Sequence, residues 1–473
     1  MLNINDYVLT EKNLNEFSHL INKTLDSIFS SIKDDTCFSG INPYVLRKQV
    51  EELEILPENG LGYDAVLKKL EEVVLPNMLR TWSTSYMPHL HSPALLESIA
   101  SELIISVFNN SLDSWDQGPS STEIEVKVIE KLLSLFGYED GDGTFTSGGS
   151  ASNLSAIVVA RDNYCTKVLK HDCKKEGLPD CYKRFKLYTS EISHFSMDKS
   201  SHLLGLGYNS VGKLKVNDKC QIDVAAAAAQ IEKDVQDGFI PYCLVATLGT
   251  TDFGSIDNVE ELRKICDKYN MHLHADAAYG SGVIMSSKYS SRLGKISLCD
   301  SITIDFHKMF LLPISCSCVL TKDKTALDCF ELHADYLNRE EDEADGYINL
   351  VSKSIQTTRR SDALKVYISF ATRGKDGYEN IINTAVENAQ YFYNRILEDE
   401  SFTPAVKPEL SSVVFRLNKS DDENKRVRRA LMEKGRVIGQ TVKDGLVMLK
   451  FTLLNPLLDK NKIDLLIQEI KSI

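Results

Sequence analysis

The chain has 473 residues, more than a single small core needs, which predicts two or three lobes or one large domain with appendages. Hydrophobic residues make up 43% and charged residues 26%, the ordinary balance of a globular protein. The formal net charge of −13 argues against nucleic acid or an anionic membrane surface as the main partner.

Cysteine usage and the absence of long apolar runs narrow the class further. No run of about 18 apolar residues occurs, so no membrane span is expected. The N-terminal sequence lacks a basic region followed by an apolar stretch, so we expect no secretory signal. Eleven cysteines without paired CxxC spacing indicate reduced thiols rather than a disulfide framework or a zinc site. These features predict a cytoplasmic protein.

Helical patterns dominate the N-terminal part of the chain. Apolar residues recur at three- and four-residue spacing over residues 14–32 and 63–75, which predicts helices. Two further helices are predicted over residues 93–108 and 121–136. The polar loop at residues 109–119 separates them, and a loop of this length between apolar helices is more often functional than decorative.

The middle of the chain alternates short β-rich runs with helical patterns, which is typical of a parallel sheet covered by helices. The expected helices include residues 151–163 and the alanine-rich segment that Asp223 can cap, which extends to about residue 237. The expected strands are residues 143–146, 185–189, 242–247, 272–275 and 300–304.

The C-terminal part changes to an α+β pattern. A long helix is predicted from Asp362, strands near residues 412–417 and 446–453, and a final helix from Lys462. The charged run at residues 339–346 precedes this part and is predicted to be a surface loop. We therefore expect a helical N-terminal segment, a large domain and a small α+β domain, at residues 1–90, 91–355 and 356–473.

Small and hydroxyl residues fill residues 146–153 (TSGGSASN), between a predicted strand and a predicted helix. Small residues let the backbone approach an anion closely, and the free N–H groups and dipole of a helix N-terminus favour a phosphate. The hydroxyls of Ser150 and Ser152 can add hydrogen bonds. A Ser/Gly-rich turn between strand and helix is also a common structural device, so this turn alone leaves both interpretations open.

A carboxylate stands at the end of the strand predicted over residues 272–275. Asp276 precedes small residues, and ligands gather at the carboxyl ends of parallel strands, so it can bind a metal, a hydroxyl or a protonated ring nitrogen. His272 and His274 alternate along the strand and share one face. Zinc would need a third ligand at a suitable position. We therefore expect these histidines to pack in or beside the core, and no metal site is predicted.

The strand predicted over residues 300–304 leads to Lys308, which directly follows His307 among apolar neighbours. Lysine is rarely buried without a partner, and a desolvated lysine has a lowered pKa and becomes a good amine nucleophile. One His-Lys pair is a weak signal. The ordered set of phosphate turn, Asp276 and Lys308, each at a predicted strand end, is more specific.

Together these features match the needs of pyridoxal 5′-phosphate (PLP). The phosphate needs a turn rich in N–H groups, the pyridine nitrogen needs an acid partner that keeps it protonated, and the aldehyde needs a lysine. His194, just beyond the strand predicted over residues 185–189, could stack on the ring. A histidine in a surface loop is the alternative interpretation of His194.

The phosphate turn, His194, and residues 246–257 (ATLGTTDFGSID), 274–282 (HADAAYGSG) and 300–308 (DSITIDFHK) together resemble the group II PLP-dependent decarboxylases. That family includes glutamate, aromatic amino acid and histidine decarboxylases. The resemblance covers nearly the whole chain. It implies the fold type I architecture of the aspartate aminotransferases, an α/β fold with a mostly parallel central sheet. It also implies a homodimer with active sites at the subunit interface.

Carried over residue by residue, the resemblance makes Lys308 the Schiff-base lysine, pairs Asp276 with the pyridine nitrogen and stacks His194 on the ring. Asp305 stands where many members have asparagine, near the phosphate. The family supplies a proton from a tyrosine on a mobile loop, and Tyr347, just after the charged run, is the expected donor. The other cofactor contacts that the resemblance implies are Ser150, Ala151, Ser152, Ala278 and His307.

Two loops separate the subfamilies by substrate. Residues 85–93 (SYMPHLHSP) fall where the family lines its substrate pocket, and His89 and His91 stand where members with aromatic substrates carry aromatic and apolar residues. Across the dimer, the polar loop presents Ser111 and Asp113. A carboxylate in a desolvated pocket is costly without a partner, so a cationic substrate end would suit it. Solvated loop charges are the alternative interpretation.

The SWDQ sequence at residues 114–117, the DFHK form of the lysine motif and residues 355–365 (IQTTRRSDALK) look most like L-2,4-diaminobutyrate decarboxylases and the related siderophore-pathway lysine decarboxylases. Diaminobutyrate would give 1,3-diaminopropane, and lysine or ornithine would give the corresponding diamine. Lys450 replaces an arginine that is common in the family near the substrate. It keeps the charge but loses the bidentate fork, which weakens a glutamate-like interpretation.

Other functions stay open at this point. The same cofactor could serve a glutamate or aromatic amino acid decarboxylase, or an aminotransferase or aldehyde synthase on the same fold. A noncatalytic binding protein could also have kept the fold. The intact set of Lys308, Asp276 and His194 argues against the noncatalytic alternative, because each of these residues serves the cofactor.

Overall fold

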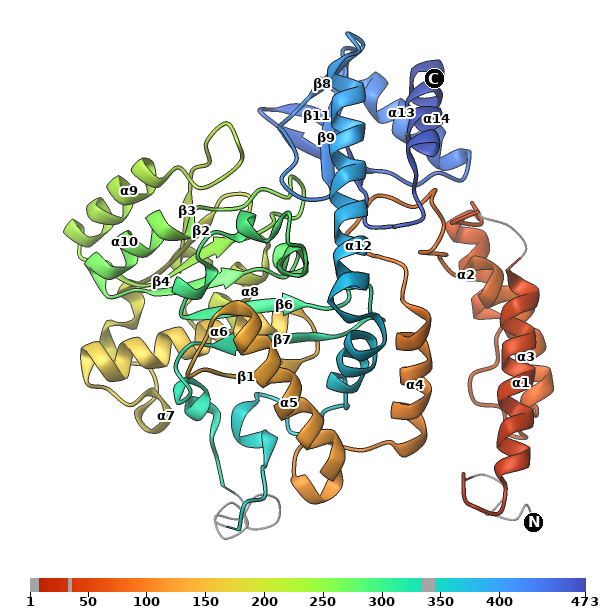
Figure 1. The fold of residues 1–473 in the computed structure, drawn as a ribbon, viewed down its shortest axis with the longest axis horizontal. Helices are drawn as coiled ribbons and strands as arrows, with labels where there is room; N and C mark the ends of the chain where they lie inside the picture. The colour runs from red at the N-terminus through yellow and green to blue at the C-terminus, as the bar shows by residue number, and fades with distance from the viewer. Residues whose placement is uncertain (1–7, 33–35, 334–344) are drawn as a thin grey trace.

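The structure, a computed structural model, describes residues 8–32, 36–333 and 345–473. Three parts are visible in Figure 1: a group of N-terminal helices that stands to one side, a central α/β body, and a C-terminal lobe above it. The long helix α12 (Ala363–Leu397) runs from the body into the C-terminal lobe and so connects the two.

The N-terminal group contains α1 (Leu14–Ser31), α2 (Pro43–Glu51) and α3 (Tyr63–Lys69). The helix predicted over residues 14–32 is confirmed almost to the residue. The one predicted from residue 63 ends earlier as an α-helix, because a π-helical turn over Leu70–Val74 replaces its last part. Two longer helices follow, α4 (Leu96–Phe108) and α5 (Pro119–Phe136), and they too confirm the predicted helices.

The central sheet has seven strands in the order β1-β7-β6-β5-β4-β2-β3. The strands from β3 to β6 in this order pair in parallel, whereas β7 pairs antiparallel with both β6 and β1. The predicted mostly parallel sheet is confirmed, and β3 and β7 are additions to it. The strands are β1 (Asp142–Thr146), β2 (Phe185–Ser190), β3 (Val211–Leu214), β4 (Ile240–Thr247), β5 (His272–Asp276), β6 (Ser301–Asp305) and β7 (Ser317–Thr321).

This topology gathers the predicted cofactor residues at one edge of the sheet. Only β7 runs against the other strands, so the carboxyl ends of β1, β4, β5 and β6 share that edge. β5 ends at Asp276, and β6 ends three residues before Lys308. The helix α6 (Gly149–Tyr164) starts shortly after β1. In open α/β sheets this edge is where ligands bind.

The helices of the body cover the sheet. α6 packs against β4, β5, β6 and β7, and α10 (Val259–Tyr269) packs against β4 and β5. Every residue of β6 and β7 is buried, as expected for strands inside an α/β domain. Asp223 caps α9 (Val224–Gln236) as predicted, because its carboxylate accepts a hydrogen bond from the backbone of Ala226 at 3.0 Å. The shorter helices are α7 (Cys173–Glu176) and α8 (Ser196–Leu203).

The C-terminal lobe pairs a four-stranded antiparallel sheet, ordered β10-β11-β9-β8, with α12, α13 (Asp421–Glu433) and α14 (Lys460–Ser472). The predicted strands and final helix in this part are confirmed within two residues. Rings of Phe392, Phe415 and Phe451 pack at centroid distances of 5.1 to 5.5 Å in its core. The strands are β8 (Phe402–Pro404), β9 (Ser412–Leu417), β10 (Gly439–Lys443) and β11 (Leu446–Thr452).

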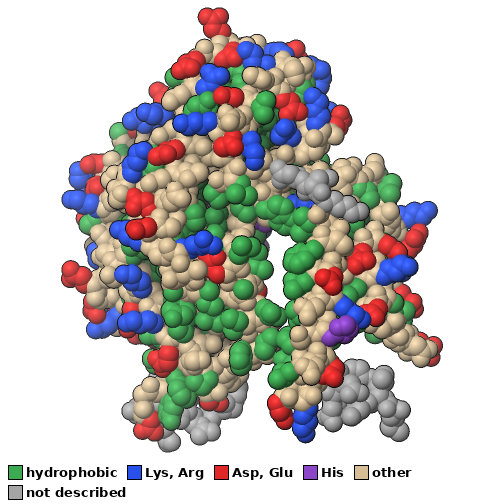
Figure 2. Space-filling view, turned by 45° about the vertical axis from the view of Figure 1, so that its right-hand side comes forward, with side chains coloured by type: hydrophobic (Ala, Val, Ile, Leu, Met, Phe, Trp, Pro, Cys, Tyr) green, Lys and Arg blue, Asp and Glu red, His purple; other side chains and the backbone are tan. Residues whose placement is uncertain are grey.

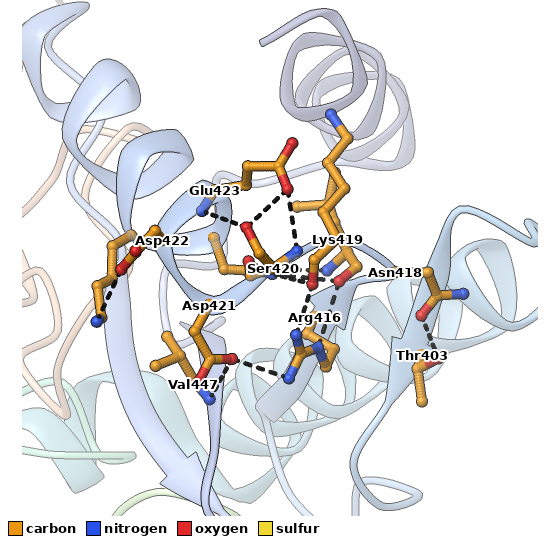
Figure 3. Close-up of polar contacts among 12 residues, drawn as sticks. Thr403, Arg416, Asn418, Lys419, Ser420, Asp421, Asp422, Glu423 and Val447 are labelled. Atoms are coloured by element: carbon orange, nitrogen blue, oxygen red, sulfur yellow. Dashed lines mark hydrogen bonds and ion pairs between the residues drawn. The ribbon is translucent and has the colours of Figure 1, made fainter.

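Polar contacts fix the start of α13 against this sheet (Figure 3). The Ser420 hydroxyl accepts a hydrogen bond from the Glu423 N–H, and the Glu423 carboxylate accepts one from the Ser420 N–H, which makes a capping box. Arg416 on β9 pairs with Asp421 at 3.1 Å. The helix is thus tied to the sheet whose strand β11 carries Lys450.

Three expectations from the sequence concern membrane spans, disulfides and metal sites. None of the helices in the described ranges is long and apolar enough to cross a membrane. None of the eleven cysteines, all of which the structure describes, forms a disulfide bond. Within the described residues, no group of three or more His, Cys, Asp or Glu side chains is arranged to hold a metal ion. Most of the charged run at residues 339–346 lies outside the described residues.

Candidate active site

A cavity of about 220 Å³ opens at the carboxyl edge of the central sheet. Six of the eight predicted cofactor contacts line it: Ser150, His194, Asp276, Ala278, His307 and Lys308. A larger cavity of about 570 Å³ lies around His272 and Asp300, near the opposite ends of the same strands, and none of the predicted site residues lines it. The smaller cavity is therefore the candidate active site.

Lys308 faces this cavity and has a buried counter-ion. Its Nζ lies 2.9 Å from Asp305 Oδ2, and the lysine side chain is 19% exposed while that of Asp305 is only 2% exposed. Asp305 also accepts a hydrogen bond from the Ser317 hydroxyl at 2.5 Å, and His307 Nε2 lies 3.5 Å from it. Burial lowers the pKa of His307, which favours its neutral form. An acid at position 305 is thus explained by its pairing with Lys308.

The first turn of α6 supplies the end of the cavity suited to an anion. Gly148 has a φ of 142°, a conformation that favours glycine, and it lets the chain turn from β1 into the helix. A Cβ on Gly149 would come within 2.8 Å of both Asp305 carboxylate oxygens, so only glycine fits there without a shift. Gly149 and Ser150 line the cavity, and the first N–H groups of a helix have no partner within it.

Ala151 and Ser152 follow one residue deeper in the same helix. Their backbone N–H groups already donate to the carbonyl oxygen of Gly148, at 2.9 and 3.1 Å. The Ser152 side chain is fully buried, and its hydroxyl shares a hydrogen bond with Thr146 Oγ1 at 2.6 Å. The donors that face the cavity from this turn therefore come from Gly149, which was not predicted, and Ser150.

Asp276 lies buried at the end of β5, with 5% of its surface exposed. Its Oδ1 accepts a hydrogen bond from the Ala278 N–H at 3.2 Å, and its Oδ2 accepts one from Asn153 Nδ2 at 3.0 Å. Both donors are neutral, so they orient the carboxylate and leave its negative charge uncompensated. Such a carboxylate suits a protonated ring nitrogen.

His194 stands beside the cavity with one nitrogen fixed by Ser196. Its Nδ1 accepts the Ser196 N–H at 3.2 Å and lies 2.9 Å from the Ser196 hydroxyl. Burial lowers the pKa of His194, and the positive charge of Lys308 adds to this effect while Asp276 opposes it. A neutral imidazole whose orientation is fixed can lie flat against an aromatic ring.

The predicted substrate loop forms the rim. Leu90 lines the cavity, and His89 and His91 flank it in the chain. Burial lowers the pKa of both histidines, and for His89 the nearby charge of Lys450 contributes. Lys450 is 6% exposed and donates a hydrogen bond to Asp252 Oδ1 at 2.7 Å. The rim therefore carries a paired cation rather than a free one.

Ser111, Asp113 and Tyr347 do not line the cavity of their own chain. They belong to one neighbourhood elsewhere: the carbonyl of Asp113 accepts a hydrogen bond from the Val351 N–H at 3.1 Å, and the Trp115 ring packs against the Tyr347 ring at 5.1 Å. The structure thus brings the predicted pocket acid, which is buried, and the half-exposed predicted proton donor into one neighbourhood outside this cavity.

The donor set at the cavity fits PLP. Backbone N–H groups at a helix N-terminus suit a phosphate, a buried carboxylate with neutral donors suits the pyridinium, and a lysine in the cavity lining could supply the amine that the aldehyde needs. Glycine at position 149 lets the helix end approach Asp305, because a Cβ there would come within 2.8 Å of both carboxylate oxygens. These residues therefore fit the predicted cofactor.

Asn153 and Ser196 link Asp276 with His194, and neither was predicted as a site residue. Asn153 donates to Ser196 Oγ at 3.0 Å as well as to Asp276. The available signal was an asparagine one turn inside a predicted helix, where this residue type is unfavourable unless a tertiary contact compensates.

Comparison with known proteins agrees with this chemistry. The pyridoxal-dependent decarboxylase conserved domain matches residues 44–418. The L-2,4-diaminobutyrate decarboxylases of Acinetobacter baumannii and Rhizobium meliloti (strain 1021) are each 35% identical, over 87% and 90% of this chain and 84% of their own length. Among solved structures, the glutamate decarboxylase domain of a diaminobutyrate-pyruvate transaminase and L-2,4-diaminobutyrate decarboxylase from Vibrio parahaemolyticus superimposes with a TM-score of 0.90 and 31% identity, covering 99% of this chain and 97% of that one.

The acidic amino acid decarboxylase of Mus musculus is 30% identical over 78% of this chain and 66% of its own length, so relatives of similar identity differ in substrate class. All of these relatives carry out decarboxylation. The matches confirm the predicted α/β architecture, the PLP cofactor and the predicted reaction type. The chain belongs to the pyridoxal-dependent decarboxylase family and is a PLP-dependent amino acid decarboxylase.

Proposed function

We propose that this enzyme converts L-2,4-diaminobutyrate to 1,3-diaminopropane and CO2. The observation that carries the proposal is the 35% identity, over most of the chain, to two L-2,4-diaminobutyrate decarboxylases. Lysine and ornithine, which carry the same pair of amino groups on a longer chain, are the next substrates to test. An acidic amino acid is the second candidate class, because two relatives at 30% identity act on such substrates.

In this proposal the cavity residues divide the work on the cofactor. PLP, when bound, supplies an electron sink for the electron pair that the departing CO2 leaves behind. Lys308 provides the amine that attaches the cofactor, Asp276 keeps its ring nitrogen protonated, and His194 covers the ring. The phosphate contacts are assigned to Gly149 and Ser150 of the α6 turn and to His307, while the predicted contacts Ala151 and Ser152 shape that turn through their bonds to the Gly148 carbonyl. Ala278 contributes through its N–H, which orients Asp276.

The substrate would lie between the rim and residues of a second subunit. We assign His89, His91 and Lys450 to the rim that faces the amino acid, with the charge of Lys450 balanced by Asp252. The partner subunit's Ser111 and Asp113 would receive the distal ammonium group, since a carboxylate attracts that cation strongly in a desolvated pocket. This assignment explains why a diamino acid would bind in preference to an amino acid without a second amino group.

We infer that the active enzyme is a homodimer. Apolar side chains remain exposed on α4, among them Leu96, Ile99 and Phe108, which are 78%, 52% and 72% exposed. Figure 2 shows hydrophobic side chains bordering an opening between the N-terminal helices and the body. Exposed apolar surface on this scale favours a protein partner. A second copy placed there would also supply Asp113 and Tyr347, which lie far from their own Lys308.

Tyr347 is the proposed proton donor to the substrate carbon after CO2 leaves. It is 43% exposed, and its ring centroid lies 5.1 Å from that of Trp115, so part of the side chain faces outward and can meet a partner. Closing such a segment over a partner's cavity would also exclude water from the reaction.

Three broader assignments accompany the proposal. Eleven cysteines without a disulfide bond support a cytoplasmic location, where thiols stay reduced. A role in making a diamine follows from the proposed substrate, and a role in siderophore biosynthesis rests on the resemblance to siderophore-pathway lysine decarboxylases. The separate seven- and four-stranded sheets support a PLP-binding domain at residues 91–355 and a small domain at 356–473, preceded by a helical segment at 1–90.

A decarboxylation screen of the purified protein tests the proposal. Diaminobutyrate, lysine, ornithine, glutamate and an aromatic amino acid are each incubated with the PLP-loaded enzyme, and CO2 and amine are quantified. We expect the highest kcat/KM with diaminobutyrate. Borohydride reduction followed by peptide mass spectrometry should place the cofactor on Lys308.

Each alternative has its own outcome in that screen. A preference for glutamate would replace the diamino acid with the acidic class, and a preference for the aromatic substrate would overturn the assignment of Asp113. Keto acid or aldehyde in place of amine would indicate an aminotransferase or aldehyde synthase. Failure to trap PLP on Lys308 would remove the mechanism, and no turnover of any substrate would favour a noncatalytic protein.

A further inference from the structure

Asn153 occupies a buried position between two residues that the mechanism needs. It lies in the second turn of α6, is 1% exposed, and lines the active-site cavity. Its Nδ2 donates to Asp276 Oδ2 at 3.0 Å and to Ser196 Oγ at 3.0 Å. Its Oδ1 lies 3.0 Å from His274 Nε2. One amide thus contacts three different side chains, and both of its N–H donors are in use.

The direction of each bond follows from the acceptor character of Asp276. An ionised carboxylate only accepts hydrogen bonds, so the amide nitrogen of Asn153 must face it and the amide oxygen must face His274. His274 therefore donates from Nε2. Burial lowers its pKa to about 3, so the imidazole is neutral and carries a single N–H.

The second nitrogen of His274 continues the chain of hydrogen bonds. Nδ1, without a hydrogen, accepts from the Ser301 hydroxyl at 2.8 Å, and Ser301 Oγ in turn lies 2.8 Å from His272 Nε2. His274 and Ser301 are both fully buried. Ser301 and His272 therefore fix the tautomer of His274, whose hydrogen lies on Nε2 and points at Asn153. Both histidines were predicted only as core residues.

The other arm of the amide reaches His194 through Ser196. Ser196 Oγ accepts from Asn153 and lies 2.9 Å from His194 Nδ1, which also accepts the Ser196 N–H. The Ser196 hydroxyl thus donates to Nδ1, and the hydrogen of the neutral His194 ring sits on Nε2. A rotation of the Asn153 amide would break the contacts to Asp276 and Ser196 together.

We propose that Asn153 is a positioning residue that sets the orientation of both Asp276 and His194, and that His274 fixes which way its amide points. The inference rests on the proposed cofactor roles of Asp276 and His194. A neutral amide donor orients Asp276 without cancelling the negative charge that the ring nitrogen needs. Through one side chain, the group assigned to the ring nitrogen and the group assigned to the ring face share a common anchor.

The test uses PLP binding in the absence of substrate, so it does not depend on which amino acid is decarboxylated. Asn153→Ala and His274→Leu remove the amide and its donor, while His274→Gln keeps an N–H that can reach Asn153 Oδ1. PLP affinity is measured by quenching of protein fluorescence, and the visible absorption of bound PLP is titrated with pH. Asn388→Ala, which removes a buried asparagine that donates only to the Leu458 carbonyl, is the matched control.

We expect Asn153→Ala and His274→Leu to weaken PLP binding by about tenfold and to shift the pH dependence of the absorption band. His274→Gln should restore most of both properties, and Asn388→Ala should leave them unchanged although it lowers thermal stability. A purely structural role for Asn153 would lower stability without moving the absorption titration. That outcome, or a His274→Gln variant no better than His274→Leu, would overturn the inference.

Asp276→Asn separates this inference from the proposed function. One outcome is that Asp276→Asn abolishes the pH-dependent change in the absorption of bound PLP while Asn153→Ala leaves that change as in the wild type. In that case the role of Asp276 stands and the positioning role of Asn153 fails. If Asp276→Asn has no effect on PLP, the cofactor assignment itself fails, and the inference fails with it. Should Asn153→Ala prove insoluble, the His274 pair carries the same comparison.

Discussion

Cations around the cavity are matched one by one with anions. Lys308 pairs with Asp305 at 2.9 Å, and Lys450 pairs with Asp252 at 2.7 Å. Asp276 differs from both acids because its partners are a backbone N–H and a neutral amide. The one carboxylate of the three without a cationic partner is therefore the one assigned to a positively charged ring.

Asp113→Ala tests the proposed diamino acid pocket. Losing a charge-assisted contact to the distal ammonium should lower kcat/KM for diaminobutyrate by about tenfold to a hundredfold, while the PLP absorption band stays as in the wild type. Asp116→Ala, which removes an exposed acid of the same loop, serves as the control. Steady-state kinetics of both variants decide, and equal losses would mean that the loop contributes only general electrostatic attraction.

His274 should leave a signature in the pH dependence of stability. Burial lowers its pKa from 6.5 to about 3 in the folded state, so between these values the unfolded chain binds more protons. Stability that is complete above about pH 6.5 is therefore lost as the pH falls through this window, by up to about 1.4 kcal/mol per pH unit.

The comparison of apo wild type with His274→Gln isolates this contribution. Between about pH 7 and pH 5 the melting temperature of the wild type should fall more steeply than that of the variant, as followed by differential scanning fluorimetry. Parallel curves for the two proteins would show that His274 is not the group that titrates.

Among the elements, a buried ion pair joins α5, β1 and the segment before α12. Arg359 Nη2 lies 3.0 Å from Glu125 Oε1 and Nη1 lies 3.1 Å from Oε2, and both side chains are almost fully buried. Arg359 also donates to the carbonyl of Phe145, and its own carbonyl accepts the Leu112 N–H. The pair therefore supports the loop that holds Asp113.

Removing one partner of this pair should lower the unfolding free energy more than removing both. Arg359→Met leaves a buried carboxylate without its cation and should cost about 3–5 kcal/mol of unfolding free energy. The double variant Arg359→Met with Glu125→Leu removes both charges and should recover much of that loss. Urea unfolding of the single and double variants measures the difference, and additive losses would contradict a coupled pair.

The elements also show what the sequence could and could not reveal. Strand positions and the phosphate turn followed from local pattern, because each carries its own periodicity and end signals. The five residues of β7 form a short buried run that gives no direction, so its antiparallel pairing could not be read. Arg359, part of a segment noted for its family resemblance, proved to have a structural role that depends on Glu125, far away in the chain.

At the scale of the whole molecule, the proposed function depends on a second subunit, because Asp113 and Tyr347 do not line the cavity of their own chain. Phe108→Asp places a charge on an exposed apolar residue at the end of α4, next to the loop of Asp113. We expect it to shift the enzyme from dimer to monomer and to abolish turnover. Leu465→Asp changes an apolar residue of comparable exposure on α14 and should leave the dimer intact. Light scattering after size exclusion gives the mass of each, and a dimeric, active Phe108→Asp variant would place the interface elsewhere.

The proposed second subunit also separates the site residues that the sequence could predict from those that it could not. The predicted cofactor residues lie at or near strand ends within one chain, so their order in the sequence was enough to predict that they meet. In the proposed homodimer, the distance from Asp113 or Tyr347 to a substrate is set by how the two copies associate. That arrangement leaves no pattern in the sequence of either copy, so sequence reasoning could not place these two residues.

The contact between Trp115 and Tyr347 gives the enzyme its own optical probe. The chain has only two tryptophans, and Trp115 is held by a hydrogen bond from its ring nitrogen to Glu123 at 2.9 Å while its ring centroid lies 5.1 Å from that of Tyr347. With Trp82→Phe as the background, all remaining indole emission originates beside the proposed proton donor. Stopped-flow fluorescence on that background can time the departure of Tyr347 from its resting place when substrate is added, without any attached dye.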